Sequence, residues 1–170
     1  MRLLFTLLLL VPLIGFTQYW QQIGQDIDGE AANDWSGTFL SINASGSLIA
    51  IGAPHNDGNG TSAGHVRIYE WNGSSWFQKG QDIDGEASYN DSGTSLSLNY
   101  LGNRLAIGAP NNNGNGNNSG HVRVYEWSGS SWIQLGQDID GDYYTGSGQS
   151  VDLNFIGDIV TIGSPRASFL

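Results

Sequence analysis

The sequence predicts an all-β protein, and three observations lead to this prediction. Gly, Asn and Ser crowd the segments between apolar stretches, and Gly alone accounts for 25 of the 170 residues. The apolar stretches alternate with period two and are rich in β-branched and aromatic side chains, which is the pattern of a half-buried strand. The same order of stretches then returns at a fixed interval along the chain. Together these features indicate short strands joined by tight turns rather than a disordered chain.

The repeat has a period of 56 residues, and Trp20, Trp76 and Trp132 open its three copies. The first two copies match at 36 of 56 positions without a gap. The copies cover residues 20–75, 76–131 and, incompletely, 132–170. Because a fixed period of this length is typical of repeat architectures, it decides which folds need to be considered.

Four predicted strands recur with this period. The first set is residues 38–43, 48–54, 65–71 and 76–83, and its last strand opens the second copy. Asn-Gly at Asn72 predicts a hairpin between the last two strands, because such turns need residues with positive φ. We expect Trp71 and Trp76 to pair across this hairpin. In the second unit, Trp127 and Trp132 have the same relation.

Four antiparallel strands repeated at this interval are the pattern of a β-propeller blade. Both faces of each strand carry apolar or aromatic groups, as expected for a blade that lies between two others. We therefore predict a partial β-propeller of four-stranded antiparallel blades, about two and a half in number. Residues 20–27 are expected to form an isolated outer strand before the first blade. A two-sheet sandwich is the alternative, but it does not account for the period.

The first 17 residues predict a signal peptide, because Arg2 precedes an apolar run over residues 3–16 and polar residues follow. The run is shorter than the about 20 residues that spanning a bilayer requires. An uncleaved anchor is the alternative. We expect a secreted or cell-surface protein with no membrane span after cleavage, in which residues 18–170 form the propeller segment.

The remaining chain is strongly acidic, with 16 Asp and Glu against 5 Lys and Arg, which are the 6 of the whole chain less Arg2. Such a surface repels phosphate backbones and anionic lipids, so nucleic acid is excluded as a partner. The chain has no cysteine. Its stability therefore depends on burial and backbone pairing without disulfides.

The inner half of each unit, at residues 37–54, 93–110 and 148–165, reads GTFLSINASGSLIAIGAP, GTSLSLNYLGNRLAIGAP and GQSVDLNFIGDIVTIGSP. These segments resemble FG-GAP repeats. The following GHVRVYEW and its Trp-bearing outer strand resemble a bacterial variant of the family. FG-GAP repeats form the propeller blades of integrin α-subunits and of many bacterial secreted proteins. The resemblance implies a propeller, typically of seven blades, that presents loops to a protein or glycan partner.

The sequence departs from the family in two ways. The loops that hold calcium in FG-GAP blades correspond to residues 43–47, 99–103 and 154–158, which carry at most one carboxylate each. Calcium takes six to eight oxygen ligands, so this metal site does not carry over. The chain also contains too few units to close a ring. We expect a fragment of a longer protein whose further blades complete the ring, with self-association or an open arc as alternatives.

An acidic motif ends each outer strand, as GQDIDGE at residues 24–30 and 80–86 and as GQDIDGD at residues 136–142. Period-two geometry points both aspartates of a motif to one face, with a third acid beyond a Gly turn. The candidate calcium ligands are Asp26, Asp28, Glu30, Asp82, Asp84, Glu86, Asp138, Asp140 and Asp142. The spacing fails the EF-hand pattern. We favour a strand end and turn, with calcium binding as the alternative.

His65 and His121 each open the third strand of their unit and stand alone there, without a cysteine or a second histidine at ligand spacing. We interpret both as hydrogen-bonded strand residues rather than as catalytic bases or metal ligands. Arg67 and Arg123 follow on the same face, and we expect them to pair with acidic residues of a neighbouring strand.

The sequence contains no nucleophile–base–acid set, no phosphate-binding loop with lysine and no zinc-binding pattern, and we predict that the protein is not an enzyme. The function expected is adhesion or the binding of a protein or glycan. The Gly- and Asn-rich loops at residues 55–64 and 111–120 are flexible in our interpretation and are also a candidate binding surface. A non-catalytic part of a secreted polysaccharide-acting enzyme and a structural spacer are the alternatives.

Overall fold

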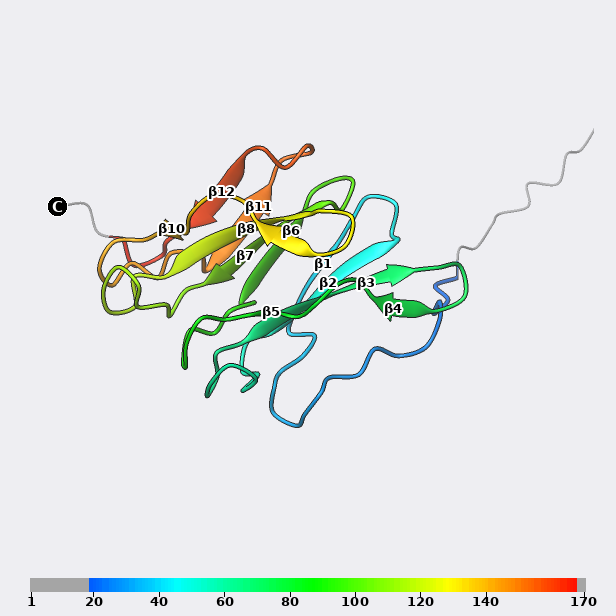
Figure 1. The fold of residues 1–170 in the computed structure, drawn as a ribbon, viewed down its shortest axis with the longest axis horizontal. Helices are drawn as coiled ribbons and strands as arrows, with labels where there is room; N and C mark the ends of the chain where they lie inside the picture. Colours follow the sequence, from blue (N-terminus) through cyan, green and yellow to red (C-terminus); the bar gives the residue numbers. More distant parts are fainter. Residues whose placement is uncertain (1–18, 168–170) are drawn as a thin grey trace, which may run out of the picture.

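The computed structural model describes residues 19–167, and this part of the chain consists of strands joined by turns and loops without a helix. The all-β prediction is therefore confirmed. Figure 1 shows that the sheets follow one another in sequence order, from the blue to the red end of the chain. Within the described range, no helix has the length and apolar character needed to cross a membrane. The predicted signal peptide, residues 1–17, lies outside the described residues.

The first sheet contains five antiparallel strands built around one long central strand. They are β1 (Phe39–Ile42), β2 (Leu48–Ala53), β3 (His65–Trp71), β4 (Trp76–Gln78) and β5 (Ile83–Asp84). The order is β1-β2-β3-β4, and β5 pairs with the start of β3 while β4 pairs with its end. The first three predicted strands agree with β1, β2 and β3 to within one residue at each end.

The second sheet has the same pairing pattern as the first. Its strands are β6 (Ser95–Leu98), β7 (Arg104–Ala109), β8 (His121–Trp127), β9 (Trp132–Gln134) and β10 (Ile139–Asp140). A third sheet consists of the antiparallel pair β11 (Ser150–Leu153) and β12 (Val160–Gly163). These two strands correspond to the first two strands of the other sheets, as the 56-residue register predicts.

The prediction of one continuous outer strand over residues 76–83 is wrong, because β4 ends at Gln78 and β5 begins at Ile83. Between them Gly80 has a φ of 83°, a left-handed value that interrupts a strand. A Cβ at Gly80 would lie 2.8 Å from the Trp127 ring, so the next sheet packs directly on the break. Residues 20–27, predicted as an isolated outer strand, also form no strand.

The predicted tryptophan pairs are present at both outer hairpins. Trp71 lies opposite Trp76 with ring centroids 5.3 Å apart, and the corresponding pair of the second sheet is separated by 5.5 Å. In the turn between them only Gly73 has a positive φ, of 95°. The Asn72 side-chain oxygen accepts the amides of Ser74 and Ser75. The asparagine therefore closes the turn with its side chain and does not occupy a central position in it.

Neighbouring sheets are joined by apolar packing and by serine hydroxyls. One buried cluster contains side chains of the first and second sheets: Leu48, Ala50, Val66, Ile68, Ile83, Leu98, Leu105, Ile107, Tyr125 and Trp132. A second cluster joins the second sheet to the third. The Leu98 amide donates a hydrogen bond to Ser41 Oγ and the Leu153 amide donates one to Ser97 Oγ, both at 2.9 Å. These bonds link β1, β6 and β11 in a row.

Candidate functional site

The acidic motifs lie where the sheets meet. In the second motif Asp84 lies in β5 opposite His65, and in the third motif Asp140 lies in β10 opposite His121. The first motif forms no strand. The second and third copies of the motif therefore each contain a separate two-residue strand and do not end the outer strand itself.

The structure brings carboxylates together across successive motifs, and a histidine joins each group. We call the two groups the first cluster and the second cluster. The first cluster contains Glu30, His65 and Asp82, and the second contains Glu86, His121 and Asp138. In each group, one ligand atom per residue lies within 4.8 Å of the others. Each cluster therefore spans two motifs that are 56 residues apart in sequence.

Four of the nine candidate calcium ligands lie in these clusters. The other five, which lie outside both clusters, are Asp26, Asp28, Asp84, Asp140 and Asp142. In each motif a glutamine four residues upstream donates a hydrogen bond to the first aspartate, at 2.8, 2.5 and 2.7 Å in order along the chain. These glutamines orient the first aspartates. Calcium binding by the motif stays a prediction.

In the first cluster the arginine engages both carboxylates. Arg67 Nη2 forms an ion pair with Glu30, and Arg67 Nε lies 3.4 Å from Asp82. The Nδ1 atom of His65 lies 3.8 Å from Asp82 and 3.9 Å from Glu30. The guanidinium therefore neutralises this cluster, as expected from the shared face of Arg67 and His65.

In the second cluster the arginine is partly withdrawn from the carboxylates. Arg123 Nη2 donates a hydrogen bond to the Asp84 carbonyl at 3.2 Å, and Arg123 Nη1 lies 3.7 Å from Glu86. His121 is 1% exposed, and its Nδ1 lies 3.3 Å from Asp138 Oδ2 and 3.8 Å from Glu86 Oε2. This nitrogen has no hydrogen-bond partner. The prediction that His121 is hydrogen-bonded is therefore wrong for its Nδ1 atom.

The electrostatics of the second cluster keep its histidine neutral. Burial is the main cause that lowers the pKa of His121 below 6.5, and the Arg123 guanidinium lowers it further. The carboxylates of Asp138, Glu86 and Asp140 oppose this shift without reversing it. Because neutral imidazole keeps one nitrogen lone pair, His121 is in the form that can accept a proton or bind a metal ion.

The sequence contains a signal for these clusters that the inspection of single units misses. In both clusters the histidine follows its glutamate by 35 residues and precedes its aspartate by 17. Each cluster histidine takes its partners from the motifs on either side of it in sequence. The groups become visible only when the units are placed side by side.

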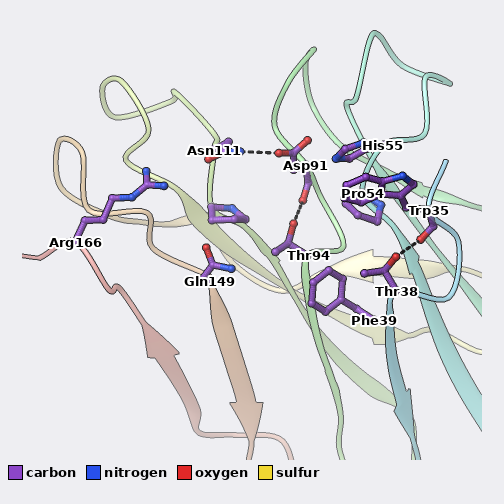
Figure 2. A pocket seen from close by; sticks show the side chains of 11 residues that line it. Trp35, Thr38, Phe39, Pro54, His55, Asp91, Thr94, Asn111, Gln149 and Arg166 are labelled. Carbon is purple, nitrogen blue, oxygen red and sulfur yellow. Dashed lines mark hydrogen bonds between the residues drawn. The ribbon is translucent and has the colours of Figure 1, made fainter. Parts of the chain in front are cut away.

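A pocket of about 250 Å³ is the second candidate site, and loops of all three sheets line it (Figure 2). The Trp35 ring stacks on His55 with centroids 3.9 Å apart and an angle of 18° between the planes. Trp35 is 56% exposed. Asn111 donates a hydrogen bond of 2.6 Å to Asp91. Figure 2 shows Arg166 on the opposite side of the pocket from Trp35.

The polar and aromatic residues of this pocket occupy equivalent positions in successive units, but the residue type at each position differs from unit to unit. Asp91 stands where the first unit has Trp35. His55 corresponds to Asn111 and, in the third unit, to Arg166. His55, Asn111 and Arg166 each follow the proline of a GAP or GSP sequence. One loop position therefore supplies an imidazole in the first unit, an amide in the second and a guanidinium in the third.

The hairpin loops that correspond to the FG-GAP calcium loops have a structural role. Asn43 Oδ1 accepts the amides of Ser47 and Leu48 at 3.0 and 2.9 Å, and Asn99 Oδ1 accepts the amide of Arg104 at 3.0 Å. These side-chain oxygens therefore close the turns between the first two strands of each sheet.

No known protein family and no curated protein sequence matches the chain. The chemistry of the clusters and of the pocket is therefore inferred from their geometry.

Proposed function

We propose that the chain is a secreted or cell-surface, non-catalytic β-propeller module of the FG-GAP type, which binds a ligand through the loops of its blades. The three sheets are the proposed blades. The proposal is supported by the 56-residue period, the common strand order of the first two sheets and the apolar packing between successive sheets. The predicted signal peptide supports the location.

The observation that carries the binding function is the pocket of Figure 2, where the units differ while the strands around it correspond. A rigid scaffold with variable loop residues is the usual arrangement of a binding surface. The exposed face of Trp35 offers a flat apolar surface, and Asp91, Asn111 and Arg166 offer hydrogen-bonding groups beside it. Such a combination suits a sugar ring, which has apolar C–H faces and a rim of hydroxyls.

A neutral glycan is the ligand class that we favour. The chain has a formal net charge of −10, which disfavours polyanionic ligands in general. Only one of the pocket-lining residues, Arg166, carries a permanent positive charge. The pocket is also small, at about 250 Å³, so it suits one sugar unit of a longer chain rather than a folded protein domain.

The proposed ring needs a further blade against β1. Leu40 and Ile42 on this strand are 62% and 59% exposed. The corresponding Leu96 and Leu98 of β6 pack in the cluster that joins the first two sheets. A blade of the same kind, from this chain or from a second copy, would cover Leu40 and Ile42 in the same way.

The binding proposal is tested with a glycan array, followed by calorimetric titration of the best neutral glycan into the chain. Trp35→Ala is expected to weaken binding by about tenfold or more, because the stacking surface is lost. Trp20→Ala is the matched control, since Trp20 is 97% exposed and does not line the pocket. Absence of glycan binding, or equal effects of both variants, would contradict the glycan assignment. Hydrolysis of the bound glycan would contradict the non-catalytic assignment.

A further inference from the structure

We infer that the second cluster, Glu86, His121 and Asp138, binds a divalent transition-metal ion of the zinc class. The site lies at the junction where the motif that contains β5 meets the start of β8 and the motif that contains β10. It is distinct from the pocket of Figure 2 and from the loops at residues 43–47 and 99–103. The inference is independent of the proposed ligand binding.

The buried Nδ1 of His121 is the observation that points to a ligand. It faces two carboxylates, and Asp138 Oδ2 lies only 3.3 Å away, yet no hydrogen bond joins Nδ1 to any group. A buried polar atom without a partner is rare in folded proteins, and an ion is one of its ordinary explanations. An ion between Nδ1 and Oδ2 would satisfy both atoms.

The distances agree with the size of such an ion. Zinc binds imidazole nitrogen and carboxylate oxygen at about 2.0–2.2 Å in tetrahedral geometry, which places two ligand atoms about 3.4 Å apart. His121 Nδ1 and Asp138 Oδ2 are 3.3 Å apart. Glu86 Oε2 lies 3.8 Å from Nδ1, and the Glu86 side chain is 46% exposed, so it has room for a small adjustment. A water molecule would complete four-fold coordination.

Hydrogen bonds from neighbouring amides hold both carboxylates in place. Gln134 Nε2 donates to Asp138 Oδ1 at 2.7 Å, which leaves Oδ2 directed at His121. Asn112 Nδ2 donates to Glu86 Oε2 at 3.2 Å. Such contacts to the ligands are typical of metal sites, where they fix ligand orientation.

The donor set selects the class of ion. One imidazole nitrogen and two carboxylates suit zinc, cobalt or a similar borderline ion. Calcium takes six to eight oxygen ligands and no nitrogen, so it fits this cluster poorly. The structure therefore favours a different metal from the one that the acidic motif suggests by itself.

The first cluster is the natural comparison, because its ligands correspond one to one. There Arg67 already forms ion pairs with both carboxylates, and His65 Nδ1 lies 3.8 Å or more from each of them. In the second cluster Arg123 contacts only Glu86 among the three ligands, at 3.7 Å, and is held by the Asp84 carbonyl. We therefore expect one tight site per chain, with the first cluster much weaker.

The test is calorimetric titration of zinc chloride into the full chain, prepared without a histidine tag and stripped with EDTA. We expect one zinc ion per chain, calcium affinity at least about 100-fold lower, and visible cobalt absorption bands typical of tetrahedral coordination. His121→Gln should weaken zinc binding by at least about tenfold, while the matched His65→Gln changes it less than about twofold.

A second variant guards against loss of the fold, because His121 is buried. Asp138→Asn keeps the side-chain shape at a position that is 26% exposed, and it should also weaken zinc binding by at least about tenfold with an unchanged circular dichroism spectrum. The proposal is overturned if zinc does not bind the wild-type chain, if folded Asp138→Asn binds as tightly as wild type, or if His65→Gln is as damaging as His121→Gln. Binding that depends on His55 would also overturn it.

Discussion

The inner strands β1 and β6 carry corresponding apolar residues and yet meet different surroundings. Ile42 on β1 is 59% exposed, whereas Leu98 at the corresponding position on β6 is 8% exposed. The difference arises because the preceding sheet covers this face of an inner strand. The first sheet covers Leu98, and the described residues contain no sheet that covers Ile42. The burial of a residue here is thus decided by the neighbouring sheet as much as by its own strand.

The same principle explains why the two clusters differ. Arg123 is held by the carbonyl of Asp84, which lies in β5. The residue that corresponds to Asp84 in the first motif is Asp28, which lies in no strand. Within residues 19–167, Arg67 has no such hydrogen bond to a strand carbonyl, and its guanidinium forms ion pairs with the carboxylates of its own cluster instead. A backbone carbonyl of the preceding sheet therefore decides whether arginine neutralises the acidic residues.

The largest effect is expected from truncating the covered and uncovered side chains. Leu98→Ala should lower the free energy of unfolding by about 2–4 kcal/mol, because it leaves a cavity between two sheets. Ile42→Ala should change it by about 0.5 kcal/mol or less, because water already reaches this side chain. Urea unfolding followed by tryptophan fluorescence measures both. Equal losses would mean that a surface absent from the described residues covers β1.

A smaller effect is expected from the close approach of backbones between sheets. A Cβ at Gly108 would collide with the Gly148 carbonyl oxygen of the next sheet. A Cβ at the corresponding Gly163 would meet only atoms of Ser150, its pairing partner on β11, of which the hydroxyl is the nearest. Gly108→Ala should therefore destabilise the fold by about 1–3 kcal/mol, and Gly163→Ala by about 0.5 kcal/mol or less. Thermal and urea unfolding of both variants check this. A tolerated Gly108→Ala would show that the second and third sheets separate readily.

The smallest effect is expected from the single lysine of the chain. Lys79 Nζ lies 3.0 Å from Glu70 and 5.2 Å from the centre of the Trp127 ring. The third unit has Leu135 at this position, so Lys79→Leu is a natural replacement. It should cost about 0.5–1 kcal/mol in low salt, and the loss should shrink in 1 M salt as the ion pair is screened. A loss that does not depend on salt would assign the effect to packing alone.

Much of the fold could be predicted because strands leave a local pattern. The alternation in residues 65–71 predicted β3 with its bounds, and the tryptophans beside the hairpin predicted the pair of Trp71 and Trp76. The break in the outer strand was missed because its cause is distant in sequence. Gly80 is required by the Trp127 ring, which belongs to the next sheet.

The candidate sites were predicted less well, for the same reason. The acidic motif predicted Asp82 and Glu86 as candidate ligands of one site, but the two residues belong to different clusters. Local sequence did not predict the clusters around His65 and His121, because the acidic partners of each histidine lie 17 and 35 residues away from it. The pocket was missed because Trp35, Asp91 and Arg166 have nothing in common until three loops meet.

Sequence alone determines that this chain folds into strands, where most of them begin and end, and the 56-residue register that relates them, because alternation and turn residues act over a few neighbours. Only the tertiary structure decides which faces are covered, which arginine neutralises its carboxylates, and that His121 faces acidic residues from two motifs. Those outcomes depend on contacts between sheets, and such contacts bring together residues that no local pattern connects.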